Sequence, residues 1–189
     1  MANNLYVAAT EPRSGKSAIT LGLMELLSRN IKKVAFFKPL VPIEDRNRER
    51  DNTINLIKSQ FNLCFDYDEM CGYTLNEASQ LISLGKEGEL MDGIMAKYNA
   101  LAAKADFILC EGAEFQGATA SFDFDINVDI ANNLGCPVFL VANGKMKTAE
   151  EVVRSIKVYH ESLEERSSDI LATIANRVDP SYVEQVQEL

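Results

Sequence analysis

The stretch Ala9–Ser17, ATEPRSGKS, decides the fold class of this chain. It overlaps the end of a short apolar run, Leu5–Thr10, and its last residues open a helical pattern over Lys16–Asn30. An apolar strand, a tight turn and a helix form the context in which a Gly-Lys-Ser triplet binds phosphate. A standard loop carries glycine five residues before Gly15, whereas Thr10 stands there. The stretch is therefore a working phosphate loop, a modified one or a chance match.

The turn offers several kinds of contact to a phosphate. Its backbone N–H groups and the positive end of the helix dipole attract phosphate oxygens. Gly15 allows close approach of the backbone, Lys16 supplies a mobile charge for the outer phosphates, and the Ser17 hydroxyl can hold Mg²⁺. Pro12 removes one N–H group from the loop, and Arg13 can occupy the anion site or contact a γ-phosphate.

Short apolar runs alternate with helical patterns along the whole chain. Most runs are apolar on successive residues, which is typical of strands covered on both faces. They are Leu5–Thr10, Lys33–Pro39, Asp106–Gly112, Pro137–Gly144 and Ile170–Val178. Capping boxes at Thr74–Glu77 and Thr148–Glu151 predict that two helices begin in the segments between these apolar runs. The alternation predicts one α/β domain over 1–189, with a doubly wound, mainly parallel sheet and helices on both faces.

Two helical segments carry apolar faces. In the first helix, the residues predicted to share one face are Ile19, Leu23, Leu26 and Leu27. The final segment places Tyr182, Val183, Val186 and Leu189 at helical spacing with no later residue to cover them. This last face is expected either to meet a partner domain or subunit, or to pack onto its own domain. The ending also suggests a fragment of a longer polypeptide, with a natural short C-terminus as the alternative.

Polar residues stand where several of the predicted strands end, and such ends meet on one edge of a parallel sheet. Lys38 ends the second run and can reach a phosphate or another anionic substrate. Glu111 ends the third run and can bind Mg²⁺ directly or through water. Asp51 is either a further ligand of the same metal or a charge at a helix N-terminus. Asn176 ends the fifth run, where an amide can read an adenine edge.

Composition excludes several classes of function. The net charge of −9 opposes binding to nucleic acid or anionic membranes, and the basic stretch Arg46–Arg50 is interrupted by Glu49. The cysteines are Cys64, Cys71, Cys110 and Cys136; they form no CxxC pair, and His160 is the only histidine, so material for a zinc site or a Ser-His-Asp triad is lacking. The absence of a signal-peptide pattern and of an apolar run of about 20 residues predicts a cytoplasmic protein without membrane contact.

Motifs at successive strand ends resemble the dethiobiotin synthetase-like branch of P-loop proteins. They are Thr10-Glu11, Gly15-Lys16-Ser17, Lys38-Pro39, Glu111-Gly112 and Asn176-Arg177. In that branch the loop begins with a threonine and an acid and lacks the first glycine, so Thr10 is a family variant. The resemblance implies nucleotide contacts at Thr10, Glu11, Arg13, Ser14, Gly15, Lys16, Ser17, Lys38 and Asn176. It implies Mg²⁺ at Ser17, Glu111 and Asp51.

Within the branch, the stretches AATEPRSGKSAITLGLMELL and VAFFKPLVP are most similar to the N-terminal domain of long bacterial phosphate acetyltransferases. A third similar stretch runs from CEGAEFQG to DINVDIANNLGCPVFLVANG. The resemblance implies a cytoplasmic, oligomeric protein in which this segment is a regulatory or assembly domain that binds ATP or another nucleotide with Mg²⁺. Acetyl transfer between coenzyme A and phosphate would reside in a C-terminal domain of the same polypeptide.

Two other functions are consistent with the same residues. The first is a dethiobiotin synthetase-type ligase, in which Lys16 and Lys38 stabilise the phosphates of ATP. Against it, KPLVPIED lacks the threonine-glycine pair that helps to hold the diamine, and EGAEFQG places Glu114 and Phe115 after the acid. The second is a degenerate P-loop scaffold without nucleotide. The partitioning ATPases are disfavoured, because Glu11 stands where they carry a lysine.

Overall fold

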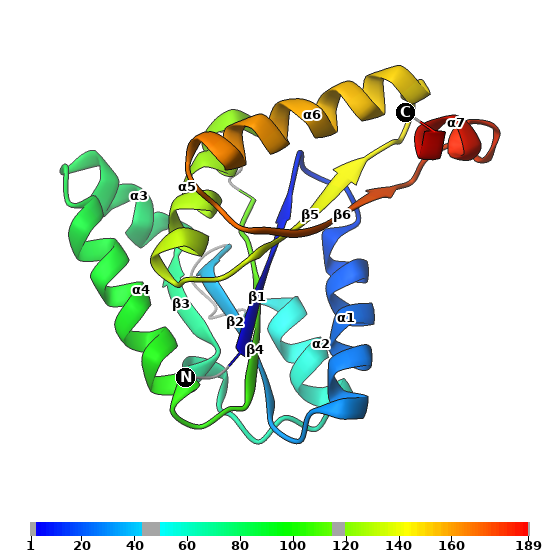
Figure 1. Ribbon diagram of the computed structural model, residues 1–189. Coiled ribbons are helices and arrows are strands. Elements are labelled where there is room, and N and C mark those ends of the chain that lie inside the picture. Colours follow the sequence, from blue (N-terminus) through cyan, green and yellow to red (C-terminus); the bar gives the residue numbers. More distant parts are fainter. Residues whose placement is uncertain (1–2, 43–49, 115–119, 189) are drawn as a thin grey trace.

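The computed structural model describes residues 3–42, 50–114 and 120–188. A parallel six-stranded sheet with order β3-β2-β4-β1-β5-β6 forms the centre of this described part, and helices cover both of its faces (Figure 1). The strands are β1 Asn3–Ala9, β2 Val34–Val41, β3 Cys71–Thr74, β4 Phe107–Glu111, β5 Val138–Asn143 and β6 Ile170–Asn176. The predicted doubly wound α/β fold is confirmed.

The helices follow the strands in the alternation expected for parallel crossovers. They are α1 Lys16–Asn30, α2 Asn52–Gln60, α3 Leu75–Ser83, α4 Glu87–Ala102, α5 Ala120–Asn133, α6 Ala149–Glu165 and α7 Val183–Glu188, with 3₁₀ turns η1 Tyr67–Glu69 and η2 Pro180–Tyr182. In Figure 1, α1 and α2 lie on one side of the sheet, and α3 and α4 lie on the other. Both predicted capping boxes are present, at Thr74 with Glu77 and at Thr148 with Glu151.

Burial follows the position of each strand in the sheet. The central strand β1 is buried from Leu5 to Ala8, and all eight residues of β2 are buried. This is the continuous apolar pattern of a strand that is covered on both faces. The two edge strands are less buried: β6, which has only β5 as a neighbour, exposes Leu171 at 61%, and only one of the four residues of β3 is buried.

Strand β3 was absent from the sequence prediction, and it changes the position of Lys38. The prediction ended the second strand at Lys38-Pro39, whereas β2 continues to Val41 and pairs there with β3. The Lys38 N–H donates to Met70 O at 2.9 Å. Pairing of β2 with β4 reaches only Phe37, so Pro39, which has no N–H, removes no ladder bond on that side. Lys38 therefore lies inside the strand rather than at its end.

The buried face of α1 also differs from the prediction. Thr20 and Met24 are buried, and Leu26, which was expected on the core face, is 58% exposed. Two residues along a helix turn the side chain through roughly 200°, so a face centred on Met24 turns Leu26 toward solvent. Ile19, Leu23 and Leu27 are half-buried against the core.

Other sequence expectations have mixed outcomes. Cys110 and Cys136 are buried as expected, whereas Tyr182 and Val186 of the final segment are half-buried and Val183 is 39% exposed. Leu189, residues 46–49 of the basic stretch and Phe115 lie outside the described residues.

Within the described ranges, no helix has the length and apolar character needed to cross a membrane, and no group of three or more His, Cys, Asp or Glu is placed to hold a metal ion.

Candidate phosphate-loop site

The loop between β1 and α1 has two residues in the left-handed backbone region. Gly15, the residue before α1, has a φ of 88°, and Arg13 has a φ of 60°. A Cβ at position 15 would lie 2.3 Å from Asn176 Nδ2, so glycine is required there by backbone conformation and by space. For Arg13 the same conformation is strained, and such strain recurs at ligand sites.

The carboxyl ends of β5 and β6 hold this loop in place. The Asn176 Nδ2 donates to Ser14 O at 2.8 Å, and the Arg177 guanidinium donates to Arg13 O at 2.5 Å. From the β5 side, the Thr10 N–H donates to Val141 O at 3.1 Å. These contacts join residues far apart in the sequence, so the shape of the loop depends on the finished sheet. The donor group of Asn176, which was predicted to read adenine, is used to hold the loop.

Helix α6 and the turn before it add two further contacts. The Tyr159 hydroxyl donates to Thr10 O, and the Lys147 ammonium pairs with the Glu11 carboxylate. Sequence reasoning identified Glu11 as a site residue but missed both partners. Nothing in the local sequence indicated which residue the Tyr159 hydroxyl would reach.

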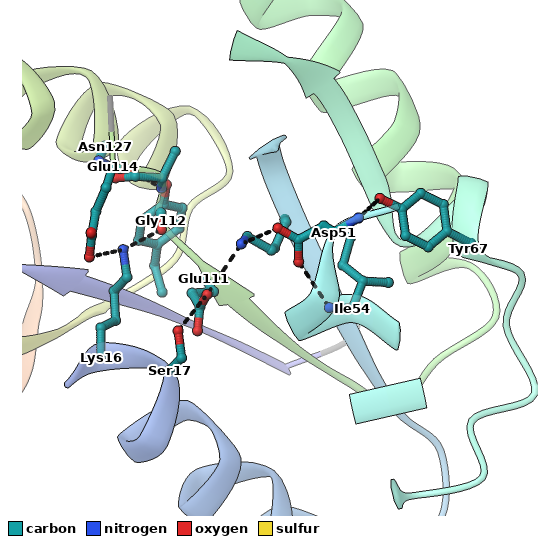
Figure 2. Close-up of polar contacts among 12 residues, drawn as sticks. Lys16, Ser17, Asp51, Ile54, Tyr67, Glu111, Gly112, Glu114 and Asn127 are labelled. Carbon is teal, nitrogen blue, oxygen red and sulfur yellow. Dashed lines mark hydrogen bonds and ion pairs between the residues drawn. The ribbon is translucent and has the colours of Figure 1, made fainter. Parts of the chain in front are cut away.

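Lys16 is a buried cation of the site. Its side chain is 5% exposed, and its Nζ donates to Gly112 O at 2.5 Å and lies 3.5 Å from Glu114 Oε1 (Figure 2). Burial lowers the pKa of Lys16, and the nearby carboxylates of Glu111 and Glu114 act in the opposite direction. Glu114 therefore places a negative charge beside the Lys16 ammonium, which the sequence analysis predicts to bind phosphate oxygens.

A second polar chain runs from α1 through β4 to the N-terminus of α2 (Figure 2). The Ser17 hydroxyl lies 3.5 Å from Glu111 Oε1, and the same oxygen lies 3.5 Å from Lys38 Nζ. Lys38 also donates to Asp51 Oδ2 at 2.8 Å. Lys38, at 6% exposure, is a buried cation held between two carboxylates rather than a cation that faces an open site.

Asp51 is the N-cap of α2. Its Oδ1 accepts from the Ile54 N–H at 3.0 Å, its Oδ2 accepts from Lys38, and its own N–H donates to the Tyr67 oxygen at 2.7 Å. The sequence leaves two interpretations of Asp51 open, a metal ligand and a charge at a helix N-terminus. The contacts described here fit the charge at the helix N-terminus. A role in Mg²⁺ binding stays a prediction, and the metal would share a carboxylate oxygen of Asp51 that already accepts a hydrogen bond.

Several buried polar atoms of the site lack a hydrogen-bond partner among the described residues. They are the Thr10 and Ser14 hydroxyls and Glu111 Oε2, together with the Thr20 hydroxyl in α1. An unpaired buried polar group costs about 1–3 kcal/mol. The first three belong to the loop and to the acid at the end of β4, and hydroxyl and carboxylate oxygens suit a hydrated Mg²⁺ and phosphate. The atoms present therefore fit a magnesium-bound phosphate ligand.

Asn127 of α5 shapes the turn after β4, and the sequence analysis did not identify it. Its Oδ1 accepts from the Tyr6 hydroxyl at 2.8 Å and from the Ala113 N–H at 2.9 Å, while its Nδ2 donates to Ala113 O at 2.9 Å. These bonds fix the turn that presents Gly112 O and Glu114 to Lys16. The one signal of Asn127 available in the sequence was an asparagine placed among the apolar residues of a helix pattern.

Comparison with known proteins gives consistent matches over this whole chain. A family model described as an AAA domain matches residues 3–189. The phosphate acetyltransferase of Nitratidesulfovibrio vulgaris is 44% identical over 185 residues, an alignment covering 98% of this chain and 26% of that protein. The phosphate acetyltransferase of Synechocystis is 35% identical over 187 residues, covering 99% of this chain and 27% of that protein. The chain thus spans about a quarter of the length of these relatives.

Solved structures share the fold at low sequence identity. A complex of Cyanothece McdA with ATP has a TM-score of 0.55 at 15% identity, and it covers 99% of this chain and 78% of its own. A GTPase from Pyrococcus abyssi in its apo form has a TM-score of 0.56 at 16% identity, and it covers 98% of this chain and 71% of its own. At these identities the likeness shows the fold alone.

Proposed function

This chain belongs to the AAA domain family that it matches, and from that premise we propose that it is a nucleotide-binding regulatory or assembly domain of a phosphate acetyltransferase. The loop at residues 10–17 would bind ATP or another nucleoside triphosphate with Mg²⁺. The observation that carries the proposal is the position of Lys16, buried at the start of α1 beside unpaired polar atoms of the loop.

Each residue of the site has a role in this proposal. Lys16 would exchange its contact with Glu114 for phosphate oxygens, and the backbone N–H groups that precede α1 would receive the remaining negative charge. Ser17 and Glu111 would hold Mg²⁺, which supplies charge neutralisation at the phosphates when it is bound. Lys38 and Asp51 would keep Glu111 oriented, since Lys38 lies 3.5 Å from Glu111 Oε1.

The acetyl transfer itself is proposed to occur outside this chain. The relatives that carry the phosphate acetyltransferase name are about four times as long, and residues 1–189 offer no chemistry for coenzyme A that we can identify. The remaining domains of the same polypeptide and further copies of it would then be the partners. This arrangement corresponds to a cytoplasmic, oligomeric enzyme.

Calorimetric titration with Mg-ATP and with Mg-GTP tests the nucleotide site. Both are needed because the fold is shared by a protein bound to ATP and by a GTPase. Lys16→Ala should weaken binding tenfold or more, since a charge-assisted phosphate contact is worth about 1.5–3 kcal/mol. Lys32→Ala, at an exposed lysine, is the matched control. Equal heats for wild type and Lys16→Ala, or none at all, would leave the degenerate scaffold as the better account.

The regulatory role needs the full-length enzyme. Acetyl phosphate formation and sedimentation should be measured with this domain present, with it deleted, and with Lys16→Ala. A nucleotide can shift activity or assembly only if it binds the two states with different affinity. The proposal therefore expects Lys16→Ala to remove the nucleotide response and keep the basal rate. If deletion changes neither assembly nor nucleotide response, the regulatory role is wrong.

A further inference from the structure

A hollow of about 190 Å³ lies where α3, α4 and α5 meet, on the face of the sheet that α3 and α4 cover (Figure 1). Its apolar lining consists of Ile82 from the end of α3, Leu90 and Met91 from α4, and Ile126 from α5. Pockets for small ligands usually have about 300–1,000 Å³. The hollow is below that range, so its size suits a single side chain of a protein partner rather than a whole ligand.

The turn between α3 and α4 adds an exposed apolar residue beside the hollow. Leu84 lies in that turn, between the lining residues Ile82 and Glu87, and it is 69% exposed. We call the hollow together with Leu84 the α4–α5 surface. An exposed apolar surface with polar residues at its rim is typical of a protein interaction site.

The rim of the α4–α5 surface is acidic. Glu87 in the first turn of α4 and Asp125 and Asp129 in α5 line the same hollow. The Arg166 guanidinium serves two of these carboxylates, because its Nη2 lies 2.8 Å from Asp125 Oδ1 and its Nη1 lies 2.8 Å from Asp129 Oδ1. No described residue forms a hydrogen bond or ion pair with the Glu87 carboxylate. The rim therefore keeps an excess of negative charge, which attracts a basic partner and repels an acidic one.

Helix α5 links this surface to the phosphate-loop site. Asp125 and Ile126 of this helix line the hollow. The next residue, Asn127, exchanges two hydrogen bonds of 2.9 Å with the backbone of Ala113. The turn that contains Ala113 presents a carbonyl oxygen and a carboxylate to the Lys16 ammonium. A partner that holds α5 in this position therefore favours the contacts of Lys16 within the chain over its contacts with phosphate.

We propose that the α4–α5 surface docks a basic amphipathic helix from a part of the full-length polypeptide outside residues 1–189, and that this docking opposes nucleotide binding at residues 10–17. An apolar side chain of the helix would fill the hollow, and arginine or lysine side chains beside it would meet the three carboxylates. This chain spans about a quarter of the length of its phosphate acetyltransferase relatives, so the remaining polypeptide is the nearest source of such a helix. The effect on nucleotide binding rests on the proposed nucleotide site, whereas the docking itself does not.

A second copy of this chain is the rival occupant. The end of α1 in such a copy offers the exposed Leu26 together with the exposed basic residues Arg29 and Lys32. Arg29 already lies 3.0 Å from the Glu25 carboxylate in its own helix, and it would have to give up that pair to meet a carboxylate of another copy. The helix from outside residues 1–189 is therefore favoured.

Photochemical cross-linking of the full-length protein identifies the occupant. The photoreactive amino acid benzoylphenylalanine replaces Leu84, and the matched control carries it in place of Leu56, a 52%-exposed leucine of α2. Mass spectrometry should find a peptide from outside residues 1–189, with arginine or lysine close to an apolar residue, joined to position 84 and not to position 56. Glu87→Lys should lower the yield of this product severalfold. Glu89→Lys should not, since it removes an acid from the same helical turn but outside the hollow.

Nucleotide affinity of the same full-length proteins tests the effect on the phosphate-loop site. Glu87→Lys should tighten binding of Mg-ATP or Mg-GTP by about fivefold or more, the lower end of allosteric coupling, whereas Glu89→Lys should not. Because coupling is reciprocal, saturating nucleotide should lower the cross-link yield at position 84. Equal affinity in the two variants would overturn the effect of docking on the nucleotide site.

The outcomes separate the docking surface from the proposed nucleotide site. A cross-link from position 84 to residues 1–189 of a second copy, equal cross-links from positions 84 and 56, or no cross-link at all would each show that the docking inference is wrong. If the expected cross-link forms but no nucleotide binds, the proposed nucleotide site and its coupling fail, and the docking surface is supported.

Discussion

Replacement of Asp51 by alanine is expected to be among the most destabilising changes at the site, because it removes two interactions at once. The first is the N-cap bond of Oδ1 with the Ile54 N–H, and loss of such a cap costs about 1 kcal/mol. The second is the pair with Lys38, whose ammonium lies 2.8 Å from Oδ2. Removing one partner of a buried pair costs about 3–5 kcal/mol because the other charge stays buried.

The expected loss is about 4 kcal/mol in the free energy of unfolding, at the low end of the sum of the two costs. Glu111 remains 3.5 Å from Lys38 and continues to compensate part of its charge. With a urea slope of about 2 kcal/mol per molar, the unfolding midpoint should fall by about 2 M.

Two further variants separate the cap from the ion pair. Thr74→Ala removes an N-cap at the exposed start of α3 and no buried charge, so its midpoint should fall by only about 0.5 M. Asp51→Asn keeps an oxygen for the Ile54 N–H but removes the negative charge, so most of the loss should persist. Urea unfolding of all three proteins decides the question. If Asp51→Ala loses no more stability than Thr74→Ala, the reasoning about the buried pair is refuted.

Three other changes should have measurable effects. Glu114→Gln should tighten nucleotide binding severalfold in calorimetry, because the 40%-exposed Glu114 side chain then no longer competes as an anion for Lys16; weaker binding would contradict this. Gly72→Ala should destabilise the fold by about 2–4 kcal/mol in thermal unfolding, because its Cβ would lie 2.0 Å from Pro39 O, whereas Gly88→Ala, with open space, should not. Burial lowers the pKa of Lys16, so the unfolded chain keeps this proton to higher pH than the folded chain. Wild type should therefore gain stability relative to Lys16→Met between neutral pH and the ordinary lysine value of 10.5; a constant difference between their urea midpoints would contradict it.

The features that the sequence determined by itself are those that depend on neighbours a few residues away. The succession of strand, loop and helix around Gly15 and the caps at Thr74 and Thr148 involve contacts within about one helical turn. The alternation of apolar runs with helical patterns then left few topologies other than a parallel sheet. For this reason the bounds of α1 and the fold class agree with the prediction.

Tertiary structure decided the partners of the site residues. Lys16 meets Gly112, 96 positions along the chain, and Asn127 meets Tyr6 at a separation of 121. Lys38 contacts Asp51 and Glu111 from within β2, which continues past it to pair with the four-residue strand β3, and β3 is too short for its apolar pattern to distinguish it from a loop. The sequence specifies these contacts only through the whole folded sheet. The pairing of buried charged residues therefore depends on strand register and on packing, and no local sequence pattern carries that information.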